Sequence, residues 1–515
     1  MSYTRTPEQD AVIRLQGQLL VVGEFACTGK TTTLMRYAQA NPQRRMLCLA
    51  YNRAIRDEAE RKFPFNVECK TSHQLAWANF GRHYQKRLRG NLRITDVARL
   101  RNSRFWPLAK TAQTTLTNFL CSAEPKPRLI HLPPEEDRAG IDPGQMLGAA
   151  QILWQKMQCT DGVFPVTHDT YLKLFQLSIP DMATRRDTIL FDETQDANPV
   201  TPAIVLNQPC RVILVGDRHE QIYRFRGADS ALDVPVLAGA DRLWLTQSFR
   251  CGLAVARQAN VLLREAGEPR AVTGSETDDE VLARLPAEYA DNHYTVLSRI
   301  VTCVIGAALT ASLEEKHVYW VGGIEGYRTE EQEDLFWFSA DMPERMKTTA
   351  LLREYRDYDE YCRVAKATSD AEMGQSVRLL EMYFPLPQKL AIMRRQAVTR
   401  EKDANVTVCT AHRSKGLEWP VVVLGDDFAD IPDPLLSTDE RTDEINLLYV
   451  STIRAMKMRV INEVMEVLNG QDNVHIVTKA IKTGPVLNVA TDDSREAEED
   501  EGRSSNGDDA VEALC

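Results

Sequence analysis

The stretch LLVVGEFACTGKTTTL, residues 19–34, decides the fold of this chain. Its apolar start, residues 19–22, predicts a buried parallel strand, residues 23–29 predict a loop, and Lys30 opens a helix whose first turn carries hydroxyls. Such a junction gathers unpaired backbone N–H groups and a partial positive charge at one point, which suits a polyphosphate. Lys30 can reach the β- and γ-phosphates, and the Thr31 hydroxyl can bind Mg²⁺. A chance Gly-Lys-Thr at a helix start is the competing interpretation, and the motifs that follow count against it.

The bulk composition is that of a globular protein with several domains. A chain of 515 residues is too long for one hydrophobic core, which predicts two to four domains. Its 43% hydrophobic and 26% charged residues are typical of a globular protein. No run reaches the ~20 apolar residues of a membrane span, and the N-terminus lacks a signal-peptide pattern. The eleven cysteines never form C-x-x-C, so we expect no disulfide framework, no zinc site and a reducing, cytoplasmic compartment.

The net charge of −11 lies mostly at the C-terminal end of the sequence. Residues 492–515 carry ten acidic and two basic side chains, and almost no large apolar ones, so we expect disorder there. The rest of the chain is close to neutral. A protein that moves on nucleic acid needs only a basic groove, so charge does not decide the partner.

Strands alternate with helices along the chain, which predicts an α/β doubly wound sheet. Residues 188–191 form an apolar strand that runs directly into DETQD, residues 192–196. The carboxyl end of a buried strand is where such sheets bind ligands. Asp192 would hold Mg²⁺, and Glu193 would polarise an attacking water. A solvated acidic turn is the alternative, but it seldom follows an apolar strand.

Further candidates stand in polar segments at either side of this acidic motif. Gln9 could hydrogen-bond an adenine edge, as amides do, and Gln221 is a candidate γ-phosphate sensor. Tyr223 and Phe225 are aromatics separated by a basic residue, a pattern typical of base-stacking surfaces. An exposed helical glutamine and two core aromatics are the alternatives, and for the aromatics the two interpretations weigh about equally.

The motif series resembles the UvrD/Rep-like superfamily 1 DNA helicases, and most closely their F-box DNA helicase branch, although no F-box-like segment precedes the motifs. The resemblance spans residues 4–480. The motifs that carry it are TPEQ (6–9), FACTGKTTTL (25–34), LAYNRA (49–54), CKTSHQLAW (69–77), DETQD (192–196), VGDRHEQIYRFRGA (215–228), LTQSFR (245–250), TAHRSKGLEW (410–419) and LLYVSTIRA (447–455). CKTSHQLAW, THDTYLKL (167–174) and HVYWVGGIEGY (317–327) point to that branch.

The resemblance implies two RecA-like P-loop motor domains with ATP between them, each carrying a mainly helical insertion. Residues 1–80 and 168–250 would form the first motor domain, and residues 81–167 its insertion. Residues 251–325 and 396–485 would form the second motor domain, residues 326–395 its short insertion, and residues 486–515 a disordered acidic tail.

The resemblance also implies roles for individual residues. Gln9 and Phe249 would hold adenine, Glu418 would approach the ribose, and Thr31 and Asp192 would bind Mg²⁺. Lys30, Glu193, Gln221, Arg250 and Arg454 would act on the phosphates and the water. The phosphate loop itself is Ala26, Cys27, Thr28, Gly29, Lys30, Thr31 and Thr32. Single-stranded DNA would contact Tyr51, Asn52, Thr71, His73, Tyr223, Phe225 and His412.

The phosphate loop departs from the family pattern at two positions. The family usually has glycine at Cys27 and a small residue at Glu24. A side chain at a loop position that needs φ > 0 costs on the order of 1 kcal/mol, and an acid beside phosphates is unfavourable unless it points away. A tolerated variation is the favoured interpretation. A slow or redox-sensitive motor, with a thiol of lowered pKa near Lys30, is the alternative. Ile453 replaces the usual Thr before Arg454, and we expect little effect.

The function implied is an ATP-dependent 3′→5′ DNA helicase or translocase in repair, recombination control or mobile-element biology. It would act on single strands and on junctions with duplex, away from membranes. An ATP-gated DNA- or protein-binding switch with little or no unwinding is the alternative. A helicase–nuclease is disfavoured, since no acidic/lysine constellation follows residue 480. A separate protein that supplies targeting or nuclease activity remains a hypothesis.

Overall fold

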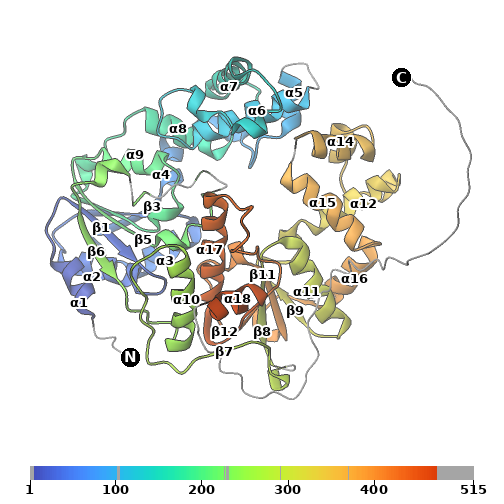
Figure 1. Ribbon diagram of the computed structural model, residues 1–515. Coiled ribbons are helices and arrows are strands. Elements are labelled where there is room, and N and C mark those ends of the chain that lie inside the picture. The colour runs from blue at the N-terminus through green and yellow to red at the C-terminus, as the bar shows by residue number, and fades with distance from the viewer. Residues whose placement is uncertain are drawn as a thin grey trace, which may run out of the picture.

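The computed structural model describes residues 5–100, 105–224, 227, 231–232, 234–289, 292–368 and 370–471 (Figure 1). Two parallel β-sheets organise these residues, and helices lie against both. The α/β fold with two parallel sheets and helical insertions that the sequence predicts is therefore confirmed. The acidic segment expected to be disordered, residues 486–515, lies outside the described residues.

The first sheet has six strands in the order β3-β2-β4-β5-β1-β6, and all its pairings are parallel. Its central strands are buried along almost their whole length, because helices cover both faces. Strand β1 runs two residues beyond its predicted end, to Glu24, because its backbone pairs with β6 as far as that residue. The strands are β1 (Leu19–Glu24), β2 (Met46–Ala50), β3 (Val67–Thr71), β4 (Thr188–Phe191), β5 (Arg211–Gly216) and β6 (Asp241–Leu245).

The first sheet and its helices form the first half of the protein, and one of these helices has a fully formed N-terminal cap. The Thr6 hydroxyl accepts the Gln9 N–H, the Gln9 side chain accepts the Thr6 N–H, and Pro7 takes the first helical position. Thr6 is therefore the N-cap of α1. The helices are α1 (Pro7–Arg14), α2 (Lys30–Ala40), α3 (Arg53–Lys62), α4 (Ser72–Asn79), α8 (His168–Leu177) and α9 (Val200–Leu206).

A helical insertion separates α4 from α8. It shares one apolar core with the first sheet, in which Phe119 and Trp154 of the insertion join Leu47 and Val212 of the strands. The shared core fixes the insertion on the sheet, because separating them would expose apolar surface to water. Its helices are α5 (Ile94–Leu100), α6 (Trp106–Leu120) and α7 (Pro143–Gln158).

The second sheet has seven parallel strands in the order β10-β9-β11-β8-β12-β13-β7. Strand β9 ends at Trp320, shortly before Gly322 and Gly323, which take positive φ values of 85° and 80°. The strands are β7 (Glu280–Leu282), β8 (Tyr294–Ser298), β9 (Val318–Trp320), β10 (Ala397–Val398), β11 (Val406–Thr410), β12 (Trp419–Leu424) and β13 (Ala455–Val460). Their helices are α10 (Leu253–Glu265), α11 (Val301–Leu313), α17 (Thr438–Thr452) and α18 (Glu463–Gln471).

Helix α17 lies between the two sheets (Figure 1). One apolar cluster contains Phe25 and Ala26 from the loop after β1 together with Leu448 and Tyr449 from α17. The two halves therefore share a core, and the carboxyl edge of the first sheet faces α17.

A second helical insertion separates β9 from β10, and it contacts the first insertion. Lys110 of α6 pairs with Asp370 at 3.3 Å, and Arg93 pairs with Glu354. Its helices are α12 (Thr329–Ser339), α13 (Ala350–Glu354), α14 (Tyr358–Thr368), α15 (Ala371–Met382) and α16 (Leu386–Gln396). Across the described part of the chain, no helix combines the length and the apolar character that crossing a bilayer requires.

Candidate nucleotide site and nucleic-acid interface

The loop between β1 and α2 has the tight backbone that a phosphate loop requires. Cys27 and Gly29 have φ values of 64° and 83°. A Cβ on Gly29 would lie 3.0 Å from Nε2 of Gln9 and 3.4 Å from the Phe249 ring, so only glycine fits there. The Cys27 carbonyl accepts the Phe249 N–H at 2.9 Å. The two residues predicted to hold adenine therefore lie together beside the loop.

Lys30 at the start of α2 is surrounded by carboxylates. Its Nζ lies 2.7 Å from Oε1 of Glu24, 3.1 Å from Oε1 of Glu193 and 3.4 Å from Oε2 of Glu220. Burial lowers the pKa of Lys30, but these carboxylates outweigh it and raise the pKa well above its usual value. The ammonium is thus held charged at the point where a phosphate is expected.

The residues predicted to bind Mg²⁺ lie beside Lys30. The Thr31 hydroxyl donates to Oδ2 of Asp192 at 3.0 Å, and Asp192 follows the last residue of β4. Burial raises the pKa of Asp192 to about 6. A hydroxyl and a carboxylate are hard oxygen ligands, and Mg²⁺ commonly takes one or two protein ligands, with phosphate oxygens and water completing its shell. The donor set therefore fits Mg²⁺.

Glu193, the residue predicted to orient the attacking water, has an unusual backbone. Its φ of 54° is left-handed, a conformation that costs energy in a residue with a Cβ and is frequent at functional sites. The Gln195 side chain donates to Oε2 of Glu193 at 2.7 Å, while Oε1 faces Lys30. The carboxylate is therefore held at the site from two sides.

Arg454, at the C-terminal end of α17, reaches the same point from the second half. It is 1% exposed, and its Nη2 lies 2.6 Å from Oε1 of Glu220. The Glu220 carboxylate thus bridges Lys30 and Arg454. Gln221, the predicted γ-phosphate sensor, has a buried Nε2 with no hydrogen-bond partner among the described residues, and its carbonyl accepts from Asn446 at 3.1 Å.

Arg250 and Glu418 are paired with each other. Their side chains form an ion pair that links the segment after β6 to the segment before β12. Burial raises the pKa of the nearby Cys27 thiol, and the Arg250 guanidinium opposes that rise. Arg250 directly follows Phe249, whose N–H donates to the Cys27 carbonyl at 2.9 Å, and Glu418 is paired with Arg250.

The remaining loop residues make contacts that the sequence did not reveal. The Ala26 N–H donates to the Tyr449 hydroxyl at 3.1 Å, the Thr28 hydroxyl donates to Oε2 of Glu24 at 3.0 Å, and Thr32 is exposed. Burial raises the pKa of Cys27 to about 12. The expectation of a thiol with a lowered pKa is therefore wrong, because burial outweighs the nearby cations.

Two further contacts between the halves involve residues that sequence reasoning missed. The Tyr449 hydroxyl donates to Oδ2 of Asp217 at 3.1 Å, and Lys415 pairs with Asp196 at 2.6 Å. Lys415 also donates to the Glu220 carbonyl at 2.7 Å. In the sequence, these residues are marked only by their position inside a motif. Their pairing could not be predicted, because the partners are 219 and 232 residues apart and only the tertiary fold brings them together.

Three of the residues predicted to contact DNA meet across the two halves. The rings of Tyr51 and Tyr223 stack with centroids 5.6 Å apart and an interplanar angle of 16°. The Tyr223 hydroxyl donates to the His412 carbonyl at 3.2 Å, and the Lys415 ammonium lies 5.7 Å from the Tyr223 ring centre. Tyr223 is half-buried, so it provides a partly accessible aromatic face beside the nucleotide site.

The other predicted DNA contacts have varied surroundings. Asn52 and Thr71 cap α3 and α4, accepting from Ile55 N and Gln74 N, and Thr71 is buried. The His73 ring packs edge-on against those of His168 and Tyr171. Phe225 lies outside the described residues.

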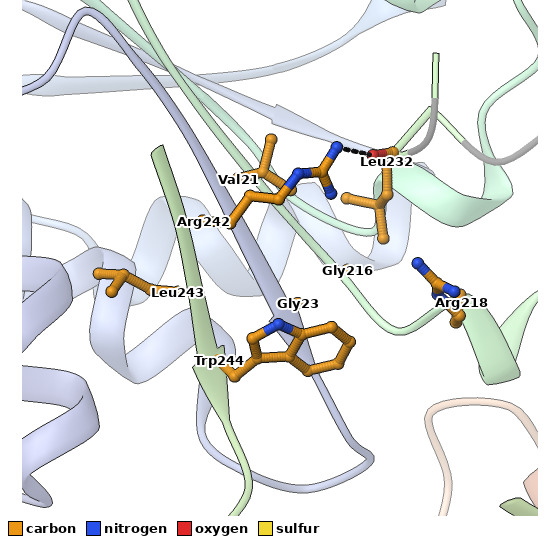
Figure 2. A pocket seen from close by; sticks show the side chains of 8 residues that line it. All are labelled: Val21, Gly23, Gly216, Arg218, Leu232, Arg242, Leu243 and Trp244. Atoms are coloured by element: carbon orange, nitrogen blue, oxygen red, sulfur yellow. Dashed lines mark hydrogen bonds between the residues drawn. The ribbon is translucent and has the colours of Figure 1, made fainter. Parts of the chain in front are cut away.

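A small pocket on the first sheet is separate from this site. Figure 2 shows Trp244 of β6 beside Gly23 of β1, and a Cβ on Gly23 would lie 2.9 Å from that ring. Arg242 donates to the Leu232 carbonyl at 3.1 Å. None of the predicted site residues lines this pocket.

Known proteins resemble this chain over most of its length. Residues 46–232 match the model of the UvrD/REP helicase N-terminal domain. F-box DNA helicase 1 of Gallus gallus is 29% identical over 535 aligned residues, which cover 93% of this chain and 51% of that protein. F-box DNA helicase protein 1 of Schizosaccharomyces pombe is 27% identical over 502, covering 89% of this chain and 57% of that protein. The chain thus spans about half the length of these relatives.

The family match begins at β2 and ends after β5, so it includes the DETQD carboxylates and the segment with Glu220. The likeness to the two relatives extends it over both sheets. The chain is therefore similar to the UvrD/REP helicases in residues 46–232, and it has two parallel sheets with a phosphate loop facing an arginine from the other half.

Proposed function

We propose that this chain is an ATP-driven motor that moves 3′→5′ along single-stranded DNA and unwinds duplex at junctions. The observation that carries the proposal is the Glu220 carboxylate, which lies within ion-pair distance of both Lys30 and Arg454. The phosphate-loop lysine of one half and an arginine of the other therefore converge on one point. A γ-phosphate at that point would be sensed from both halves.

The proposed roles divide between binding and charge stabilisation. Gln9 and Phe249 flank the adenine, Lys30 binds phosphates, and Arg454 neutralises charge that develops on the transferred phosphoryl group. Glu193 accepts a proton from, or orients, the attacking water. Thr31 and Asp192 would hold Mg²⁺, which supplies Lewis-acid stabilisation of phosphate charge. Arg250 and Glu418, which are paired with each other, would approach the phosphate and the ribose.

Gln221 stays the proposed γ-phosphate sensor. Its buried Nε2 has no hydrogen-bond partner among the described residues, and its backbone carbonyl is coupled to α17 through Asn446. The neighbouring Glu220 carboxylate contacts Lys30 and Arg454.

The proposed domains follow the two sheets. Residues 1–80 and 168–250 would be the first motor domain and residues 251–325 and 396–485 the second, with residues 81–167 and 326–395 as insertions. This division is supported by the strands, since β1 to β6 form one sheet and β7 to β13 the other. ATP binding would close the cleft between them and hydrolysis would reopen it, so that each cycle would advance the motor.

The proposed track includes Tyr51, Tyr223 and His412, which meet at the border of the two halves. Aromatic faces stack on any base, so the grip would be sequence-tolerant. We further propose action in repair, recombination control or mobile-element biology in a reducing cytoplasm, with a separate protein supplying targeting or nuclease activity. Among the described residues the ten cysteines are free thiols, which supports the reducing compartment.

ATP hydrolysis measured with and without single-stranded DNA tests the proposal, with Lys30→Ala and Glu193→Gln as inactive controls. We expect DNA to stimulate hydrolysis, and a 3′-tailed duplex to be unwound while a 5′-tailed one is not. An ATP hydrolysis rate that does not change when DNA is added, or unwinding of the 5′-tailed duplex, would contradict the proposed function.

An ATP-gated switch is the second candidate, favoured by the Glu24 carboxylate that lies 2.7 Å from Lys30 in the phosphate loop. An acid at this position would slow turnover and favour a role in which ATP gates binding. DNA-stimulated hydrolysis without strand displacement would favour the switch over the helicase.

A further inference from the structure

Glu24 closes strand β1 with a carboxylate that points into the nucleotide site. The residue is 1% exposed, its Oε1 lies 2.7 Å from Lys30 Nζ, and its Oε2 accepts the Thr28 hydroxyl at 3.0 Å. The sequence made an acid here unfavourable unless it pointed away from the phosphates. It points toward them and lies on Lys30, so it competes with a phosphate for that ammonium. Burial raises the pKa of this carboxyl well above its usual value, and Lys30 opposes the rise.

Glu220 makes the equivalent contact from the opposite side. One of its oxygens lies 3.4 Å from Lys30 Nζ, and the other lies 2.6 Å from Nη2 of Arg454. Burial alone would raise the pKa of this carboxyl, but Lys30, Arg454 and Lys415 together lower it. The carboxylate is therefore ionised and satisfied by the same two cations that a γ-phosphate would need.

Three carboxylates surround the Lys30 ammonium, where a phosphate is expected. Its Nζ donates to Oε2 of Glu220 at 3.4 Å, and it lies within ion-pair distance of Glu24 and Glu193. The Lys30 side chain is 15% exposed, so water offers little alternative solvation. A phosphate that binds Lys30 must therefore compete with these ion pairs.

We propose that Glu24 and Glu220 form an internal latch on Lys30 and Arg454 that competes with the ATP phosphates for these two cations. The latch rests on the proposed function, because it presumes that ATP binds at Lys30. Glu24 and Glu220 are positioning residues here: they set the ATP affinity and take no part in phosphoryl transfer. Glu193 is excluded from the latch, because its removal would also remove the proposed base.

If the latch exists, substituting Glu24 should make ATP bind more tightly, whereas substitutions in a phosphate loop usually weaken ATP binding. Glu24→Gln removes the charge but keeps the oxygen that accepts the Thr28 hydroxyl, so the loop retains its hydrogen bond. We expect Glu24→Gln to bind ATP about tenfold more tightly, because a competitor for a buried cation has been weakened. KM for ATP would fall in parallel, with kcat within about twofold of wild type.

The experiment titrates the full chain with a fluorescent mant-ATP analogue and Mg²⁺, comparing wild type, Glu24→Gln, Glu220→Gln and the double variant. Both single variants bind more tightly, and their effects are less than additive because both act through Lys30. Asp334→Asn is the matched control: this carboxylate is 3% exposed, accepts the Lys347 N–H in the second insertion, and its loss leaves ATP binding unchanged. Thermal unfolding of each variant reports folding separately.

Unchanged or weaker binding by folded Glu24→Gln would overturn the latch, even if DNA-stimulated hydrolysis proves the motor function. Tighter binding without any DNA-stimulated hydrolysis would uphold the latch and overturn the motor function. Failure of every variant to bind the analogue would overturn both.

Discussion

The two halves of the protein bring opposite charge to the nucleotide site. At the carboxyl edge of the first sheet lie Glu24, Asp192, Glu193 and Glu220, with Lys30 among them. The second half brings cations to the same place, Lys415 from the segment after β11 and Arg454 from the residues between α17 and β13. Each half alone would leave buried charge unpaired, which is expensive in a low-dielectric interior. The charges of each half therefore neutralise those of the other.

The pKa values show which acids depend on this pairing. Burial raises the pKa of Asp192 and of Asp217 to about 6, and that of Asp196 to about 7. For Glu220 the cations of the second half and Lys30 reverse the direction and lower the pKa. The acids at the first edge therefore differ in how far the cations around them offset burial.

The largest expected effect comes from removing the second half's arginine. Arg454→Ala should lower DNA-stimulated ATP hydrolysis about 10³-fold, the lower end of what arginine fingers supply. Steady-state hydrolysis at saturating ATP measures it. Arg394→Ala is the control, since that guanidinium pairs with Glu325 and Glu333 in the second insertion. A rate within twofold of wild type for Arg454→Ala would break the comparison of the two halves.

A smaller loss of ATP hydrolysis is expected from a substitution at the carboxyl edge of the first sheet. Glu193→Gln should slow hydrolysis about 10²-fold, in the range of a lost general base, while ATP binding is kept. Single-turnover hydrolysis and mant-ATP titration separate the two. If the variant fails to bind ATP instead, Glu193 serves to hold Lys30 and not to activate water.

The aromatic contact between the halves should affect DNA alone. Tyr51→Ala removes one ring of the stacked pair with Tyr223, and we expect about tenfold weaker binding of single-stranded DNA, since stacking contributes ~1–3 kcal/mol per base. Fluorescence anisotropy with a labelled oligonucleotide measures the loss, and DNA-free ATP hydrolysis is the control. Unaltered DNA affinity would place the strand elsewhere.

The smallest expected effect concerns Lys173, a buried cation that forms no carboxylate ion pair among the described residues and so contrasts with the paired cations of the nucleotide site. Lys173 is fully buried, donates to the Ser122 carbonyl at 2.7 Å, and burial lowers its pKa to about 8. Between pH 8 and 10.5 the unfolded chain binds more protons at this lysine than the folded one, so stability gains with rising pH. Thermal unfolding should show a Tm contribution of about 2 °C that Lys173→Met lacks. Identical pH profiles would contradict the lowered pKa.

The fold could be predicted from the sequence where the chain itself carries the signal. The apolar strands lie within one or two residues of their predicted ends, because burial is a local pattern. The place of the DETQD carboxylates at the site was predictable because they directly follow a buried strand.

The rest of the site depends on contacts that no local pattern encodes. Glu220 and Gln221 are neighbours, and the short 3₁₀ turn over Arg218–Glu220 decides which of them faces Lys30. Tyr449 lies in an apolar helical motif that resembles ordinary core, and only the fold places its hydroxyl on Asp217. The Cys27 thiol was misjudged because its burial, which sets its pKa, arises from the packing of both halves.

One hydroxyl ties the nucleotide loop, α17 and the segment after β5 together. Tyr449 accepts from Ala26 and donates to Asp217, so both hydrogen bonds pass through a single oxygen. If α17 moves away, the Ala26 amide and the Asp217 carboxyl therefore lose this shared hydroxyl together. Movement of α17 is in this way communicated both to the nucleotide loop and to the segment after β5.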